Sequence, residues 1–113
     1  MPGSLNETAL QAVLDALPLD ITCVDGNNII RFYSDYRIFE RNPGILGTRV
    51  EECHPPASRP AVSALISDLH AGKKEAAEFT IDKNGRRVRV RYFAPRDAAQ
   101  AYLGMVETAE WLD

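Results

Sequence analysis

Apolar residues recur at helical spacing in two segments of the chain. Residues 5–16 carry the first stripe, after a Ser4-Leu5-Asn6-Glu7 stretch that fits the capping-box pattern of helix starts. Residues 58–72 carry the second stripe, which begins at a serine and ends at a glycine, as helices commonly do. Its apolar positions fall at i, i+3, i+4 and i+7: Val62, Leu65, Ile66 and Leu69. The pattern predicts a short amphipathic helix and a longer one.

Period-two alternation and β-rich composition predict five strands. The first two should form a hairpin around Gly26-Asn27-Asn28, and the third and fourth a hairpin around Asn84-Gly85, the strongest short hairpin signal. In the fourth strand, valines and Tyr92 alternate with arginines and Phe93, which predicts one apolar face and one solvated face. The expected strands cover residues 19–25, 29–34, 75–82, 86–94 and 100–108.

Residues 35–50 interrupt the regular pattern with several short helical turns, broken at Asn42-Pro43-Gly44. Long irregular segments often wrap binding sites. The full order is helix, two strands, short turns, longer helix and three strands. This order predicts an α+β fold, in which a five-stranded antiparallel sheet carries helices on one face and has an N-terminal helix.

Composition narrows the class of protein. A chain of 113 residues with 45% hydrophobic content predicts one soluble domain, which we place at residues 5–113, and residues 1–4 can be a remnant of expression. A net charge of −3 argues against direct nucleic-acid binding, and no apolar run is long enough for a membrane span. Residues 1–20 lack a signal-peptide pattern, so we expect a cytoplasmic protein with Cys23 and Cys53 as thiols.

The Glu52-Cys53-His54-Pro55-Pro56-Ala57-Ser58 stretch is the strongest candidate for function. Two prolines stiffen the chain just before the long helix, so His54 should sit on a short rigid connector that aims its side chain. The alternative is a surface turn with an incidental histidine. Cys53 and His54 could also form a nucleophile and base, but no carboxylate or amide that would orient the base can be placed, so we do not predict an enzyme.

The chain resembles the PAS family often joined to hemerythrin-like domains. The resemblance runs from about residue 5 to residue 109 and implies the PAS fold. It rests on Leu17–Asp25, Arg37-Ile38-Phe39, Gly47, Cys53-His54-Pro55-Pro56 with Ser58, and Arg91–Ala94 with Arg96-Asp97.

His54-Pro55 with Ser58 also resembles the haem PAS domain of carbon-monoxide-sensing bacterial transcription regulators. This second resemblance implies that His54 and Met105 are the axial ligands of a haem b, which is iron protoporphyrin IX. Those regulators carry a redox-linked cysteine in the third-strand region, and residues 75–81 have none. The implied function is a sensor in which a diatomic gas such as CO, NO or O2, or a redox change, displaces Met105.

The remaining haem contacts are assigned to residues around this pair. Arg91 is predicted to reach a propionate, because guanidinium and carboxylate groups pair well. The expected apolar walls are Val62, Leu65, Ile66, Leu69 and Leu103. The alternative is a haem-free PAS module that binds another small ligand or mediates dimerisation, with Met105 as a core filler.

The helix of residues 5–16 has two interpretations. Its apolar face either packs on its own domain or contacts a second copy of the chain. We predict a homodimer formed through this helix and the outer face of the sheet, where Phe93 is expected to be exposed.

Overall fold

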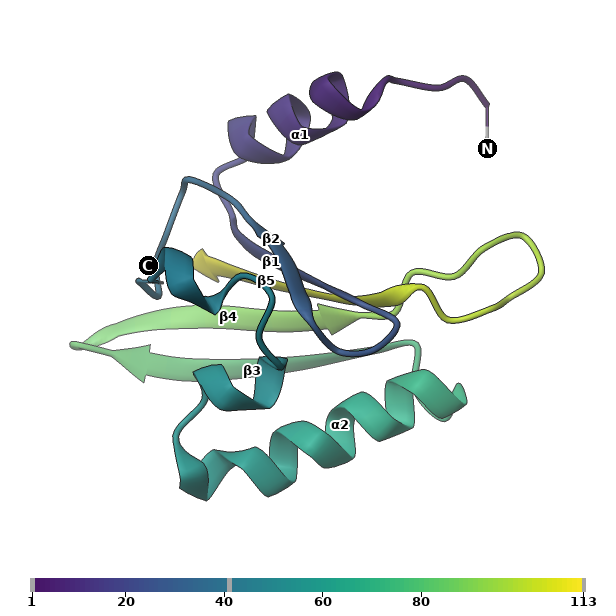
Figure 1. Ribbon diagram of the computed structural model, residues 1–113. Helices are drawn as coiled ribbons and strands as arrows, with labels where there is room; N and C mark the ends of the chain where they lie inside the picture. The colour runs from purple at the N-terminus through teal and green to yellow at the C-terminus, as the bar shows by residue number, and fades with distance from the viewer. Residues whose placement is uncertain (1, 41, 113) are drawn as a thin grey trace.

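A five-stranded antiparallel sheet organises the chain in the computed structural model, which describes residues 2–40 and 42–112. The strands lie in the order β2-β1-β5-β4-β3, with helices on either side (Figure 1). Residue 1, the start of the possible expression remnant, and residue 113, the end of the expected domain, fall outside this description. The elements are α1 (Glu7–Ala16), β1 (Asp20–Asp25), β2 (Ile30–Tyr33), the 3-10 turns η1 (Pro43–Ile45), η2 (Val50–Cys53) and η3 (Pro56–Ser58), α2 (Arg59–Ala71), β3 (Ala76–Lys83), β4 (Arg86–Phe93) and β5 (Gly104–Trp111). The predicted α+β class and element order are confirmed.

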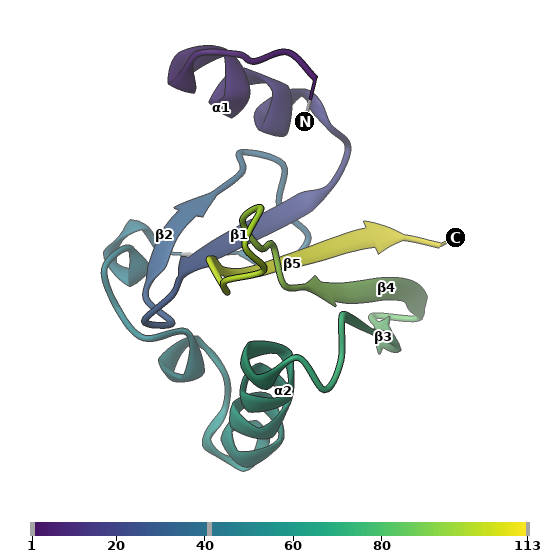
Figure 2. The same ribbon diagram turned by 90° about the vertical axis from the view of Figure 1, so that its right-hand side faces the viewer.

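Helix α2 covers one face of the sheet, which we call the inner face (Figures 1 and 2). All four residues of its predicted apolar stripe are buried, and each such side chain contributes roughly 1.5–3 kcal/mol. Gly72 ends the helix with φ of 79°, a left-handed conformation that glycine adopts without strain. Among the described residues, the Ser58 hydroxyl caps no backbone N–H of α2, so this serine marks the helix start without the predicted bond.

The inner face of the sheet supplies the other half of the core. The predicted alternation in β4 is confirmed, since its valines and Tyr92 are buried while Arg87, Arg89 and Arg91 point to the opposite, outer face. Register places Met105 beside Val24 and Glu107 beside Thr22, so these four residues share the inner face. The buried apolar residues of this face are Val24, Val88, Val90, Tyr92, Met105 and Ala109.

Two backbone features fix the strand connections. Asn84 and Gly85 have φ of 55° and 82°, which gives the predicted tight hairpin between β3 and β4. Gly104 begins β5 with φ of 148°, and a Cβ atom there would lie 2.0 Å from the Val24 carbonyl oxygen. Only glycine therefore allows β5 to approach β1 this closely.

Two predicted boundaries are wrong. Strand β5 runs from Gly104 to Trp111 rather than over residues 100–108, because Asp97 accepts hydrogen bonds from the Ala99 and Ala101 backbone N–H groups and folds that segment into a turn. Helix α1 is capped by Asn6, whose side chain accepts from the Ala9 N–H at 2.8 Å, and not by the predicted serine.

Helix α1 lies on the opposite side of the sheet from α2, as both views show (Figures 1 and 2). Its Asp15 carboxylate accepts a hydrogen bond from the Asp35 N–H at 3.0 Å, which ties the helix to the loop after β2. Leu10, Val13 and Leu17 remain exposed. No helix in residues 2–40 or 42–112 is long and apolar enough to cross a membrane.

Candidate functional site

A cavity of about 460 Å³ lies between the connector that precedes α2 and the inner faces of β3 and β4. Its wall is mostly apolar, and its polar groups come from the connector, from β5 and from Tyr92 of β4. This combination is typical of small-molecule sites in proteins. The lining residues are Phe39, Cys53, His54, Pro55, Ser58, Ala61, Val62, Phe79, Ile81, Val90, Tyr92 and Glu107.

The connector holds His54 as the sequence predicts. His54 ends the turn η2, where its N–H donates to the Glu51 carbonyl at 3.2 Å, and Pro55 then leads into η3. The Arg59 Nε–H donates to the His54 carbonyl at 3.2 Å, which joins the connector to the first turn of α2. With its backbone fixed at both ends, His54 directs its imidazole into the cavity wall.

Both nitrogens of the His54 ring have neighbours. Nδ1 lies 3.1 Å from the Val50 carbonyl oxygen and 3.5 Å from Cys53 Sγ, and Nε2 lies 4.0 Å from Glu107 Oε2. The hydrogen bond with Cys53 raises the pKa of His54, although burial opposes it, and Val50 and Glu107 raise it further. The site therefore favours the protonated imidazole more than water does.

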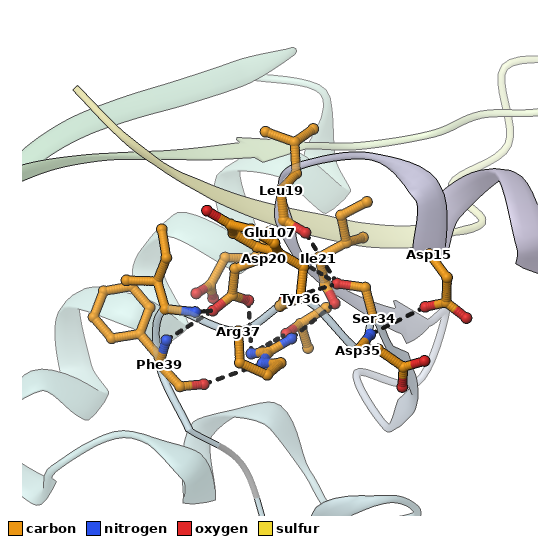
Figure 3. Close-up of polar contacts among 12 residues, drawn as sticks. Asp15, Leu19, Asp20, Ile21, Ser34, Asp35, Tyr36, Arg37, Phe39 and Glu107 are labelled. Carbon is orange, nitrogen blue, oxygen red and sulfur yellow. Dashed lines mark hydrogen bonds and ion pairs between the residues drawn. The ribbon is translucent and has the colours of Figure 1, made fainter. Parts of the chain in front are cut away.

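Glu107 lies next to a second group of buried polar residues (Figure 3). The Asp20 carboxylate, 3% exposed, pairs with Arg37 Nη2 at 2.6 Å and accepts from the backbone N–H groups of Ile38 and Phe39. Arg37 also donates to the Ile21 and Phe39 carbonyls. This cluster fixes Phe39 against β1 and so shapes one wall of the cavity.

A buried serine joins the segment after β2 to the start of β1. Ser34 Oγ accepts from the Ile21 N–H at 2.9 Å and lies within hydrogen-bond distance of the Leu19 and Tyr36 carbonyls (Figure 3). These bonds anchor the segment after β2 to the start of β1. The irregular segment that sequence predicts as a binding wall is therefore held in place by side chains.

The residues predicted for a haem site are spread over four environments. His54 and Val62 line the cavity. Leu65, Ile66 and Leu69 lie in the core with Met105, which is 1% exposed, and none of these four is among the described lining residues. Leu103 is 54% exposed ahead of β5. Arg91 lies on the outer face, where its Nη2 contacts Glu110 Oε1 at 3.2 Å.

This arrangement does not fit a haem held between His54 and Met105. Axial ligands must face the iron from opposite sides of the porphyrin, whereas here Glu107 lies opposite the His54 ring and Met105 packs in the core. Arg91 points away from the cavity side of the sheet, so it cannot reach a propionate there. The pairing of His54 with Met105 stays a prediction without support from this geometry.

Sequence reasoning missed Glu107, Asp20 and Arg37 as parts of the site. A signal for Glu107 was present, because it stands two residues after Met105 and must share its face of the strand. Asp20 and Arg37 stand in two stretches that carry the family resemblance, but no local pattern indicates that they pair, because their contact depends on how the loop after β2 folds back.

The fold and this cavity define the class of protein. The sequence profile described as "PAS domain" matches residues 10–110, which is nearly the whole chain. The chain therefore belongs to the PAS domain family, as its sequence resemblance implies. A search among curated proteins found no match.

Solved structures agree with this assignment. The C-terminal domain of a Streptococcus mutans protein has 29% sequence identity and a TM-score of 0.90, over 100% of this chain and 90% of that one. The PAS domain of Bordetella pertussis BvgS has 15% identity and a TM-score of 0.72, over 94% and 85%. A sensory box sensor histidine kinase from Vibrio cholerae has 11% identity and a TM-score of 0.66, over 94% and 91%.

Proposed function

We propose that this PAS domain is a sensory module that binds a small, mostly apolar molecule carrying one hydrogen-bond donor. The observation that carries the proposal is the cavity, whose apolar wall ends at the half-buried side chain of His54 and the buried side chain of Glu107. This proposal corresponds to the haem-free alternative of the sequence analysis, a PAS module that binds another small ligand. The sensory role is supported by the fold likeness to the Vibrio cholerae sensor histidine kinase.

The apolar wall supplies the affinity. Phe79 and Ile81 point to the inner face of β3, line the cavity and are 50% and 39% exposed. A bound molecule would cover both side chains, and removing apolar surface from water contributes about 25 cal/mol per Å². Val62 and Val90 form the deeper wall and are already buried.

The polar end supplies the selectivity. Glu107 offers carboxylate oxygens, which accept hydrogen bonds and repel negative charge. A hydroxyl or amine on the ligand is therefore favoured there, whereas a carboxylate is disfavoured. Ser58 lines the same cavity and can donate or accept.

The signal would leave the site through β5. This strand is central in the sheet and pairs with β1 on one side and β4 on the other. A ligand that binds Glu107 would break the contact between Glu107 and His54. The central strand would then lose its tie to the connector before α2. Loss of this one contact could then be transmitted through the outer face of the sheet and through a dimer interface.

Titration with benzyl alcohol and with benzoate tests this proposal. Amide chemical shifts in NMR spectra should move around the cavity with the alcohol, and benzoate should bind at least tenfold more weakly. Ala61 lines the cavity, so Ala61→Trp should abolish binding. Ala64 lies on the same helix but not among the described lining residues, so Ala64→Trp should leave it unchanged. Equal binding by the two Trp variants would refute the site.

Haem-dependent sensing of CO, NO or O2 is checked by a separate titration. Haemin bound through His54 would give a saturable Soret shift that His54→Ala removes. Without a saturable shift in the wild type, the haem function is ruled out and the haem-free module stands.

A further inference from the structure

Cys53, His54 and Glu107 form a series of thiol, imidazole and carboxylate at the polar end of the cavity. Cys53 Sγ lies 3.5 Å from His54 Nδ1, and His54 Nε2 lies 4.0 Å from Glu107 Oε2. The first distance is within reach of a sulfur hydrogen bond, and the second is that of an ion pair. A nucleophile beside a base that a third group orients is the arrangement that activates cysteine for covalent chemistry.

The Val50 carbonyl oxygen lies beside both groups and can accept a hydrogen bond from either. It lies 3.0 Å from Cys53 Sγ and 3.1 Å from His54 Nδ1. It can accept from the thiol before proton transfer and from the Nδ1–H afterwards. In the tautomer that serves as a base at Nδ1, the other proton is on Nε2 and faces Glu107, 4.0 Å away, and this carboxylate stabilises the imidazolium that proton transfer produces.

Cys23 provides an internal contrast. It lies on β1 opposite Val106 and Phe32, on the outer face, and burial raises the pKa of its thiol. Cys53 instead lines the cavity beside a base. Reactivity follows thiolate character and access, so the two cysteines should differ.

We propose that Cys53 captures an electrophilic ligand of the α,β-unsaturated carbonyl class inside this cavity. His54 takes the Sγ proton, and the sulfur forms a bond to the β-carbon while the alkene π electrons move to the enolate. The His54 imidazolium then returns its proton to the α-carbon, so the product is a thioether with no oxidant consumed. The Ser58 hydroxyl, which lines the cavity, can donate to the carbonyl oxygen during addition. The proposal rests on the cavity being the ligand site.

Intact-mass kinetics with phenyl vinyl ketone test this capture. Cys23→Ser leaves Cys53 as the reporter, and Cys53→Ser leaves Cys23. At pH 7 the first variant should gain one adduct at least tenfold faster than the second. In the Cys23→Ser background, His54→Gln should slow the reaction about a hundredfold and Glu107→Gln by a smaller factor.

The pH profile separates a base from a structural role. The groups facing His54 are Cys53 from the connector, Glu107 from β5, Tyr92 from β4 across the cavity, and Arg59 at its carbonyl. With His54 present, the rate should level off once the imidazole has lost its proton. With His54→Gln, it should keep rising through about pH 8.5, as for an ordinary thiol.

Equal rates for Cys53 and Cys23, or a profile unchanged by His54→Gln, would overturn the capture. Benzyl alcohol binding to the Cys53→Ser protein is measured in parallel. If the alcohol binds but Cys53 is slow, the ligand site stands and the covalent step fails. If neither occurs, both proposals fail.

Discussion

The Nε2 atom of His54 lies 4.0 Å from the Oε2 atom of Glu107. This contact joins the connector before α2 to the central strand of the sheet, at the inner end of the cavity. A ligand at the cavity wall can therefore act on the strand that would carry a signal by changing this contact. Its charge state therefore matters for both stability and binding.

Stability should depend on pH through His54. Contacts with Cys53, Val50 and Glu107 raise the pKa of His54 above its ordinary value of about 6.5. A raised folded-state pKa stabilises the fold below the unfolded pKa, and this contribution is lost as pH rises through the folded value. The free energy of unfolding that His54→Gln removes should thus be larger at pH 5.5 than at pH 8.5, as measured by urea denaturation. An equal difference at both pH values would contradict the raised pKa.

The buried pair of Asp20 and Arg37 should be essential to the fold. Arg37→Ala leaves the Asp20 carboxylate buried without this partner, and breaking such pairs costs about 3–5 kcal/mol. Arg31→Ala removes the exposed contact with Asp25 at 2.8 Å and should change stability little. Thermal and urea unfolding of both variants measure this, and similar losses in the two would show that burial of the Asp20 pair is unimportant.

Gly104→Ala should destabilise the protein strongly. The added methyl would lie 2.0 Å from the Val24 carbonyl oxygen, and the backbone φ of 148° is itself unfavourable for alanine. We expect a loss of about 3 kcal/mol in the free energy of unfolding. Gly26→Ala is the matched control, because its Cβ would meet only ordinary contacts at 3.9 Å and beyond. A stable Gly104→Ala protein would contradict the close approach of β5 to β1.

The exposed face of α1 predicts self-association. Leu10 and Val13 lie about one turn apart on α1 and are exposed, as is Leu17 at the C-cap. The helix lies on the opposite side of the sheet from α2. Leu10→Glu should weaken a homodimer at least tenfold, because it places a charge in an apolar contact. Gln11→Glu, on a different side of α1, should not. Sedimentation at several protein concentrations measures the dissociation of the dimer. A wild-type protein that is monomeric at high micromolar concentration would refute the dimer.

The elements of this fold follow from local patterns that need no tertiary information. The stripe through Val62 and Leu69 identifies α2, and Asn84-Gly85 identifies the hairpin of β3 and β4. The predicted bounds of β5 are too early in the chain because the Asp97 side chain organises a turn at this point. Apolar periodicity does not reveal such a turn.

The site was harder to predict than the fold because it depends on contacts distant in sequence. His54 was identified from its rigid connector, and Val62 from its helical stripe, and both line the cavity. Apolar residues on both faces of the last strand leave its parity open in the sequence, and in the structure Glu107 lies opposite His54 while Met105 packs in the core. Met105 and Glu107 both point inward from β5. Pairing of β5 with β1 and β4 sets the strand register, and the register decides which of the two meets the His54 ring.

The most direct measurement of the central claim is the affinity ratio of benzyl alcohol to benzoate in Glu107→Gln protein. If Glu107 sets the preference for a donor, removing its charge should narrow the ratio at least tenfold relative to wild type. Glu110→Gln, on the outer face of the same strand, should leave the ratio unchanged. A ratio in Glu107→Gln equal to that of wild type would contradict ligand recognition at this end of the cavity.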